Sequence, residues 1–406
     1  MSSISLLIAR YAIVAAAVVA ACYSALLARA SFLFQQDTAI SVPAAVHLVP
    51  YNSAYLARLA VWQPDRKFAL LQRAVDLNPF AAESWIQLGL IAEMQQHDVS
   101  RAERYYLKAA EVDHMFLPRS TLANFYFRRQ DESKFFEWAR ATLNITPFPP
   151  FPVFDQMWLF TQNAAQIAAS IPERPSILIQ YAMFLSGTHQ FAALPPVVSR
   201  LVTAAGSAHP ESAGRDGVIG PIEDNLLAEG SLQPALQIWT SMKDGNWITL
   251  PAPAPSHPLT NGAFATSFFG HGFDWTPTNP AGVRTEQIPD QKEVRFTFSG
   301  SQAEHCSLLQ QYLPLDPNHS YRLHWKTEAQ SIETPSGLAW RLHPVRSNSQ
   351  TDITSGDLLA SPSGAWDFEP PAGSEIFLLT LEYSRPLGNI LAKGTIDLQS
   401  VSLEEQ

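Results

Sequence analysis

The chain has 406 residues, of which 46% are hydrophobic and 16% charged, and its formal net charge is −10. A chain of this length holds about two or three domains. The acidic balance and the lack of a lysine- or arginine-rich block argue against a nucleic-acid partner. With Cys22 and Cys306 as its two cysteines, the sequence predicts neither a disulfide framework nor a cysteine-based metal site.

An uncharged apolar run lies near the N-terminus, between Arg10 and Arg29. Its 18 residues approach the length of about 20 that crosses a bilayer, and the flanking arginines can extend to the interfaces. Apolar character resumes at 31–34, directly after Arg29. We therefore expect residues 1–35 to form an uncleaved signal-anchor helix that spans a membrane once.

Two other membrane-related interpretations of this run stay open. Residues 28–30 have the A-x-A form of a signal-peptide cleavage site, and 19–22 resemble a lipoprotein box that would be acylated at Cys22. All three interpretations place the bulk of the chain outside the cytoplasm, and we expect a bacterial inner-membrane protein that is mostly periplasmic. A buried helix of a soluble domain is the remaining alternative.

A helical period in residues 67–92 stops at Pro79 and restarts at Trp85. The spacings from Ala74 to Pro79, and on to Trp85 and Gly89, resemble the junction between two tetratricopeptide (TPR) repeats, A-x4-P followed by W-x2-L-G. Small residues let paired helices approach closely, and proline ends a helix because it lacks an N–H group. The resemblance implies an α-solenoid that binds a partner protein in its groove, and it implies no catalytic activity.

Helical periodicity extends on both sides of this junction, and we interpret 45–245 as a TPR-like helical solenoid. On pattern alone, Trp85 and Trp138 are expected to lie in its core. The clearest predicted helices are 54–59, 68–77, 85–94, 101–112, 121–129 and 133–143, and weaker ones follow at 155–170, 175–185, 195–204, 222–228 and 233–242.

A proline-rich segment, 246–258, separates this region from one with a different hydrophobic period. Beyond it, apolar and polar residues alternate, as in half-buried strands, and 259–406 is predicted to form an antiparallel β-sandwich, a jelly roll. The phase of the alternation changes near Gln399 and Ser400, which indicates a β-bulge. The clearest strands are 294–298, 321–326, 338–343 and 396–403.

The ends of this domain resemble the jelly rolls of carbohydrate-binding modules. The similarity rests on N-G-A-F at 261–264, F-D-W at 273–275, and I-D with V-S-L at 396–397 and 401–403. It implies that the domain binds a glycan. Ala265 stands where the family often has a glutamate that helps to hold calcium, so the resemblance does not extend to a calcium site here.

One set of side chains is a candidate surface for a glycan or another anion. If the strands 321–326 and 338–343 are neighbours, cationic or titratable side chains share a sheet face that could meet uronate or phosphate groups. The alternatives are an ordinary solvated face or one that docks on the solenoid. The candidate residues are Arg295, Arg322, His324, Lys326, Arg341 and His343, with Trp275 and Trp366 as candidate stacking aromatics that could instead pack in the core.

The sequence contains no zinc-protease helix, phosphate-binding glycine loop or serine-nucleophile elbow, and we expect no catalytic residue, cofactor or metal. The expected role is a membrane-anchored extracytoplasmic scaffold. Its solenoid would bind a partner protein, and its sandwich would bind a glycan or brace the solenoid. The two resemblances together imply service in cell-surface polysaccharide assembly or export.

Two alternatives come from other functional classes. One is a glycan-active enzyme or an accessory subunit of such an enzyme, which would need a pair of carboxylates facing a cleft. Asp274, Glu382 and Asp397 would be the first acids to test. The other is a purely structural envelope subunit without a ligand.

Overall fold

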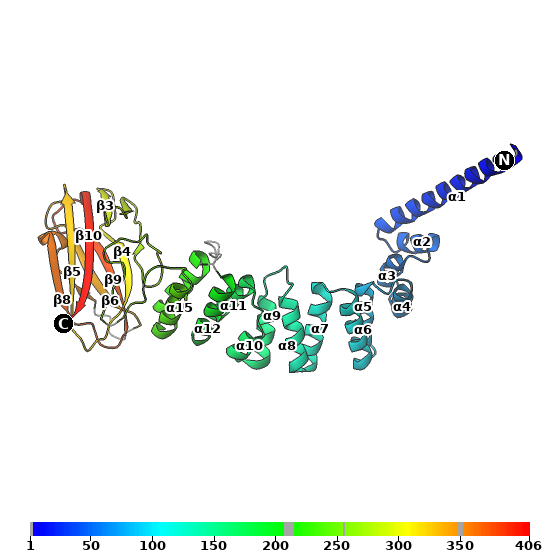
Figure 1. Cartoon of the computed structure of the whole chain (residues 1–406), viewed down its shortest axis with the longest axis horizontal. Helices are drawn as coiled ribbons and strands as arrows, with labels where there is room; N and C mark the ends of the chain where they lie inside the picture. Colours follow the sequence, from blue (N-terminus) through cyan, green and yellow to red (C-terminus); the bar gives the residue numbers. More distant parts are fainter. Residues whose placement is uncertain (1–2, 207–214, 255, 347–351) are drawn as a thin grey trace. The chain divides into compact units, whose positions relative to one another are not determined.

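The computed structural model describes residues 3–206, 215–254, 256–346 and 352–406 (Figure 1). Its contacts divide the chain into two compact units, Met1–Pro149 and Pro150–Gln406. The first unit is helical over its described residues, and the second contains further helices followed by two antiparallel sheets. The predicted fold class, an apolar N-terminal helix, a TPR-like helical region and an antiparallel β-sandwich, is therefore confirmed.

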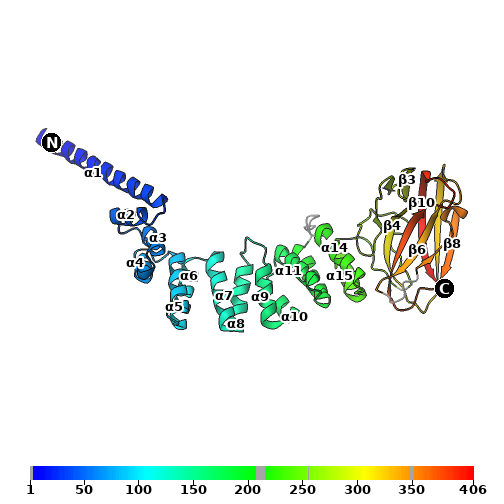
Figure 2. The same ribbon diagram turned by 180° about the vertical axis from the view of Figure 1, so that it is seen from behind.

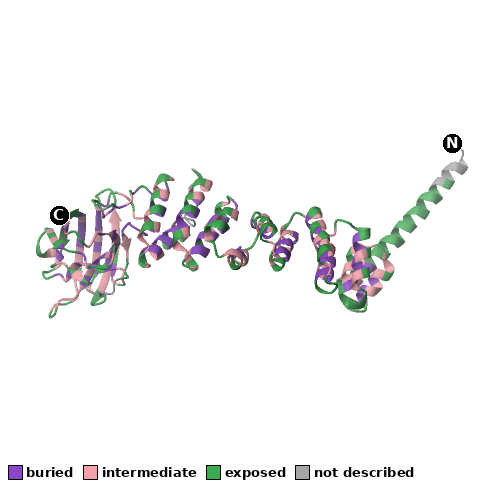
Figure 3. Ribbon diagram, turned by 90° about the horizontal axis from the view of Figure 1, so that it is seen from below, coloured by how far each residue is buried: buried purple, intermediate pink, exposed green. Residues whose placement is uncertain are grey.

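The apolar run forms most of helix α1 (Ser3–Gln35). Its segment Arg10–Gln35 has 26 residues and a mean hydropathy of 2.1, which is long and apolar enough to cross a bilayer. A signal sequence has the same properties. Figure 3 shows α1 exposed over most of its described length. Only its last turns are covered, because α2 (Ser41–Leu48) packs there and buries Ala30.

The helices that follow α2 in the first unit pack in successive pairs, as the repeat pattern predicts. Side chains of Asn52, Asp98 and Asp131 cap the starts of three of them by accepting hydrogen bonds from backbone N–H groups. The pairs are α3 (Ser53–Trp62) with α4 (Lys67–Leu77), α5 (Ala82–Met94) with α6 (Val99–Val112), and α7 (Phe116–Arg129) with α8 (Glu132–Leu143).

A close contact in the second pair joins Gly89 of α5 to the ring of Tyr106 on α6. A Cβ atom built on Gly89 would lie 2.4 Å from Cε1 of Tyr106, which is far inside van der Waals contact. The ring cannot move away freely, because the Tyr106 hydroxyl donates a hydrogen bond to Glu93 at 2.9 Å. The sequence therefore needs glycine at this position to bring the two helices together.

Helices continue through the first part of the second unit. The helix predicted at 155–170 is two helices in the structure, because Gln162 adopts a left-handed conformation (φ 50°) and Asn163 caps the second helix. A π-helical segment, Arg215–Ile219, leads into α14. The helices are α9 (Phe151–Thr161), α10 (Ala164–Ser170), α11 (Pro175–Gly187), α12 (Leu194–Ala205), α14 (Gly220–Ala228) and α15 (Leu232–Asp244).

Two antiparallel sheets form the sandwich, in the strand orders β1-β4-β9-β6-β7 and β2-β3-β10-β5-β8 (Figures 1 and 2). The register between β10 and β5 shifts between Leu398 and Ser400, which confirms the predicted bulge. The strands are β1 (Thr276–Pro277), β2 (Val283–Ile288), β3 (Glu293–Ser299), β4 (His305–Pro314), β5 (Tyr321–Gln330), β6 (Leu338–Pro344), β7 (Ile353–Thr354), β8 (Ser363–Phe368), β9 (Ile376–Ser384) and β10 (Lys393–Glu405).

Within the second unit the helices and the sandwich are in direct contact. Trp239 of α15 is fully buried, and its ring lies edge-on to Phe269 and Phe273, with centroids 5.9 and 5.6 Å apart. The segment predicted as a linker, 246–258, contains the buried side chain of Trp247. A fragment limited to 259–406 would lose the contacts of Trp239 with Phe269 and Phe273.

We predict that Gly89→Ala lowers the free energy of unfolding of the full chain by about 1–3 kcal/mol, because the new methyl group overpacks against Tyr106. The matched control is Gly187→Ala at the end of α11, where a Cβ would meet nothing within 4 Å. That control should gain up to about 1 kcal/mol from helix propensity. Urea unfolding in detergent, followed by circular dichroism, measures both. Equal stability of the two variants would contradict the repeat contact.

Candidate binding groove

The first unit contains a groove of about 710 Å³ formed by α3 and the starts of α4 and α5. Small side chains on α3, Ala54 and Ala57, leave room in it, and Val61 and Phe80 expose large apolar surface at its border. Val61 is 55% exposed and Phe80 is 77% exposed. A concave region with exposed apolar side chains is typical of a surface that binds another molecule.

The end of α1 forms one wall of this groove through Phe34. The Phe34 ring stacks on Tyr55 of α3 with centroids 4.5 Å apart. Just beyond α1, Asp37 accepts hydrogen bonds from Nε of Arg58 at 2.6 Å and from Nε1 of Trp62 at 3.1 Å. The hydrogen bonds from Arg58 hold the pKa of Asp37 below its ordinary value. The end of α1 is thus fixed to the first repeat.

Polar groups in the groove are largely paired with one another. Nζ of Lys67 donates a hydrogen bond to Oε1 of Gln87 at 3.0 Å, across α4 and α5. Arg58 is paired with Asp37, and Glu83 on α5 is exposed. The groove therefore presents apolar surface next to hydrogen-bonding groups of both charges, a combination that suits a peptide segment better than a highly charged ligand.

A buried polar network keeps α5, α6 and α7 in place beneath the groove. Glu93 accepts a hydrogen bond from the Tyr106 hydroxyl. It also accepts hydrogen bonds from Nε and Nη2 of Arg128, at 3.0 and 2.8 Å. Burial, and then the hydrogen bond to Glu93, raises the pKa of Tyr106. Since Glu93 is buried, removing its cationic partner would leave a desolvated charge.

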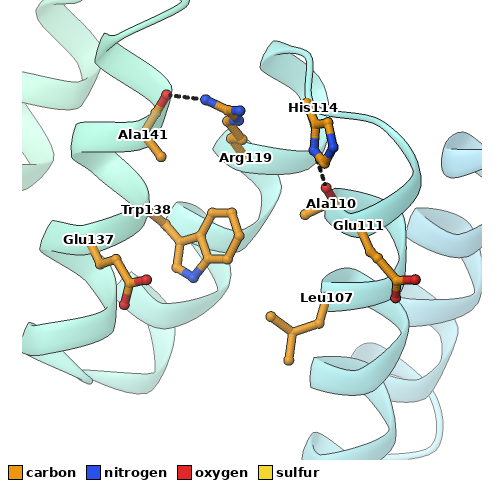
Figure 4. Close-up of a pocket in the computed structure, with 8 residues that line it drawn as sticks. All are labelled: Leu107, Ala110, Glu111, His114, Arg119, Glu137, Trp138 and Ala141. Carbon is orange, nitrogen blue, oxygen red and sulfur yellow. Dashed lines mark hydrogen bonds between the residues drawn. The ribbon is translucent and has the colours of Figure 1, made fainter.

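A second hollow, of about 460 Å³, lies between α6 and α8 (Figure 4). The Trp138 indole faces Leu107 across it, and Arg119 donates from Nη1 to the carbonyl of Ala141 at 3.2 Å. Trp138 is only half-buried, and so is Trp85, whose Nε1 donates to the Pro79 carbonyl. The prediction that both tryptophans lie in the core holds in part: Trp85 packs against the buried cluster of the first repeats, whereas Trp138 borders the hollow.

The structure does not bring the predicted anion-binding side chains together. Strands β5 and β6 are not neighbours: β5 pairs with β10 and β8, and β6 pairs with β9 and β7. The residues therefore divide between the sheets. Arg295, Arg322, His324 and Lys326 lie on the sheet of β3 and β5, and Arg341 and His343 lie on the other sheet.

Most of these side chains also have acidic partners. Arg295 donates from Nε to Asp397 at 2.6 Å, and Nη2 of Arg322 donates to Asp367 at 2.7 Å. On the other sheet, Nδ1 of His343 lies 2.6 Å from Asp352, and Arg341 forms ion pairs with Asp352 and Glu382. The outward faces are thus covered by alternating charges, with little net positive field for an anionic glycan.

The two candidate stacking tryptophans point toward the core. Trp275 is fully buried, with its ring 5.9 Å from Phe264 and 6.0 Å from Trp340. Trp366 is half-buried and packs on Phe368 at 4.6 Å. Neither exposes the full ring face on which a sugar would stack.

The three carboxylates considered for catalysis each have partners of their own. Asp397 pairs with Arg295, and Glu382 pairs with Arg341. Asp274 is buried and accepts from the backbone N–H of Phe269 at 2.6 Å. Burial raises the pKa of Asp274 to about 6 against these hydrogen bonds. No group of three or more His, Cys, Asp or Glu side chains with metal-binding geometry occurs in the described parts of the chain.

Comparisons with known proteins give only distant structural similarities. No family model matches the chain, and no curated protein matches it. Among solved structures, the helical part is similar to YrrB, described as a TPR protein with an unusual peptide-binding site. The identity is 12%, the match covers 51% of this chain and 93% of that one, and the TM-score is 0.23.

Two further solved structures match different parts of the chain. A TPR repeat-containing protein from Cytophaga hutchinsonii is 13% identical over 54% of this chain and 94% of its own, with a TM-score of 0.30. A structure described as "CBM4 structure and function" is 12% identical over 33% of this chain and 88% of its own, with a TM-score of 0.24. Similarities with TM-scores this low carry no argument about the fold or the role of this chain.

We predict that Trp275→Ala lowers the free energy of unfolding by about 3–5 kcal/mol, because it removes a fully buried ring from the sandwich core. The comparison variant is Trp366→Ala, which should cost less because that side chain is half-buried at the edge strand β8. Chemical denaturation of the full chain measures both. A loss of less than about 1 kcal/mol at Trp275 would instead indicate a surface ring of the stacking kind.

Proposed function

We propose that this chain is a protein-interaction scaffold, anchored to a membrane by α1, that holds a segment of a partner protein in the groove between α3 and α5. The groove itself supports the proposal, because it combines a volume of about 710 Å³ with exposed Val61 and Phe80 beside paired polar groups. A peptide could bury the apolar side chains and exchange hydrogen bonds with Lys67 and Gln87.

On this proposal α1 is an uncleaved span, and the rest of the chain lies outside the cytoplasm, in the periplasm of a bacterium. The length and hydropathy of Arg10–Gln35 support a span. The stacking of Phe34 on Tyr55 adds a reason for retention, because cleavage after Ala30 would leave Phe34 on a short free end. A cleaved signal peptide and a lipoprotein acylated at Cys22 are the competing outcomes.

We propose that the sandwich braces the solenoid. The burial of Trp239 against Phe269 and Phe273 supports this role. Glycan binding, and with it a part in polysaccharide assembly or export, is the alternative. Glycan binding would then use a smaller surface than the six-residue one predicted from the sequence, and this surface would be centred on His324 and Lys326 of β5.

We further propose that the chain binds rather than catalyses. The glycan-active alternative requires two carboxylates that face one cleft. Glu382 and Asp397 lie on strands of different sheets, β9 and β10, and each is held by an arginine. A hydrolase assay on bacterial surface polysaccharides with the purified full chain tests this part, and turnover above background would contradict it.

The groove is tested by Ala54→Trp, which places an indole in the space where we expect the partner segment. Ala54 is exposed, so the variant should fold as the parent does. A partner that co-purifies with the full chain from detergent-solubilised native membranes should be reduced at least about tenfold, which corresponds to a loss of about 1.4 kcal/mol in binding.

The matched control is Ala169→Trp, on an exposed position of α10 in the second unit. It should leave the co-purification unchanged. If both variants keep the partner, or both lose it, the groove is not the binding site.

The anchor is tested by intact-mass measurement of the protein from native membranes and by extraction with carbonate. We expect a chain that starts at or near Met1, resists carbonate and is released by detergent. Cys22→Ser should change neither the membrane location of the protein nor its intact mass, apart from the substituted atom. A start near Ser31, or a diacylated Cys22, would show that the run is a signal sequence.

A further inference from the structure

A buried carboxyl group lies where the helices of the second unit meet the sandwich. Glu223 of α14 has no exposed surface, and neither of its carboxyl oxygens has a hydrogen-bond partner in the described part of the chain. Buried carboxyl groups in folded proteins almost always have partners. Burying Glu223 without a partner therefore costs folding free energy at the contact between the helices and the sandwich.

Asp224, the next residue in the sequence, lies at the same junction but is hydrogen-bonded. Consecutive helical residues point roughly 100° apart. Asp224 is turned toward the loop of the sandwich, where it accepts from the Gly272 N–H at 2.7 Å and lies 2.6 Å from Nδ1 of His271. Asp224 therefore holds the loop, while Glu223 is enclosed beneath it.

The enclosure of Glu223 depends on the loop staying in place. A Cβ atom on Gly272 would lie 3.4 Å from Cβ of Glu223 and 2.8 Å from the Trp239 ring, so the loop backbone lies directly on both. A Cβ atom on Gly220 would likewise meet the His271 ring at 2.5 Å. If the loop lifted from α14 and α15, water would reach the Glu223 carboxyl.

The charged and titratable groups around Glu223 offer it no compensating cation. Burial raises the pKa of Glu223 well above its ordinary value, and the negative charge of Asp224 raises it further. From the loop, His271 is engaged by Asp224. From β4, Tyr312 has a pKa that is raised by burial and then by Asp224. Burial without a hydrogen-bond partner or a cation therefore favours the neutral form of Glu223 while the junction is closed.

We propose that Glu223 is a pH-sensitive latch: its neutral form permits the loop Phe269–Phe273 of the sandwich to close on α14 and α15, and its ionisation releases the loop. An open junction would solvate the carboxylate and expose Trp239, Phe269 and Phe273. The junction would then present a new apolar surface when the pH rises. The closed form is the braced scaffold, and the open form is a more mobile one.

The direction in which pH shifts the opening equilibrium follows from proton linkage. The closed state binds the proton more tightly than the open state, in which the carboxyl group has its ordinary pKa. Closure is therefore favoured at low pH and weakens as the pH rises above that ordinary value. Since opening releases one proton in this window, the opening constant should increase about tenfold for each pH unit until the closed-state pKa is passed.

Hydrogen exchange of the full chain, followed by mass spectrometry, tests the latch. Protection factors for amides of the loop, including Gly272, are measured between about pH 5.5 and 7.5 and corrected for the intrinsic exchange rate at each pH. In the parent, loop protection should fall as the pH rises, by up to about tenfold per unit, while amides of β9 in the sheet keep theirs. In Glu223→Gln, loop protection should be higher at the upper pH and independent of pH.

Controls separate Glu223 from the groups around it. Glu369→Gln, an exposed glutamate of the sandwich, should behave as the parent does. Asp224→Asn should lower loop protection at every pH but keep the slope. If Glu223→Gln lowers protection in β9, Glu223→Met, of similar size and uncharged, replaces it in the test.

Two results would overturn the proposal. One is a parent protein whose loop protection does not change with pH. The other is a slope that persists in Glu223→Gln and disappears in His271→Asn, which would assign the pH dependence to the pair of His271 and Asp224.

Discussion

The close approach of α5 and α6 at Gly89 sets the geometry on which the first unit depends. Because Gly89 has no side chain, the Tyr106 ring lies against the α5 backbone, and its hydroxyl reaches Glu93 on the same helix. Glu93 then accepts hydrogen bonds from Nε and Nη2 of Arg128 on α7. One steric requirement thus fixes three helices, and the N-terminal part of α5 that lines the groove is fixed with them.

Charged side chains are handled in two different ways in this structure. In the first unit and on the sandwich faces, charges occur in pairs, such as Arg128 with Glu93 and Arg295 with Asp397, whose acidic members are buried. Pairing compensates these buried carboxylates and reduces the net positive field that would attract an anionic glycan. Glu223 is the contrast, because it is buried without a partner at a place where two layers can separate. A scaffold that binds through apolar contacts and changes its bracing with pH is consistent with both features.

Local patterns predicted the elements well where a single physical rule decides them. The spacing from Ala74 through Pro79 to Trp85 gave the helix pairs, and the phase change near Ser400 gave the bulge in β10. The strand order could not be predicted, because alternation shows which face a residue occupies but not which strand lies beside it. The assumed neighbours 321–326 and 338–343 therefore proved to belong to different sheets.

A partner-binding groove was expected in the solenoid, but the residues that line it could not be named from the sequence, for a related reason. Phe34, Arg58 and Gln87 come from three helices, and no local motif joins them. The repeat phase carried a partial signal, since Gln87 follows Trp85 by two positions on the first helix of its repeat. Trp85 and Trp138 look like core residues by periodicity. Trp85 does pack against the buried cluster of the first repeats, whereas Trp138 borders the hollow between α6 and α8.

The most direct test of the central claim is photo-crosslinking in native membranes from a benzophenone amino acid placed at Val61, on the border of the groove. Our account predicts a crosslink to one defined protein, competed by a synthetic peptide that corresponds to the crosslinked segment. The same probe at the exposed Ala169 of α10 should not give that product. Equal crosslinking from both positions, or none from Val61, would contradict the assignment of the groove as the binding site.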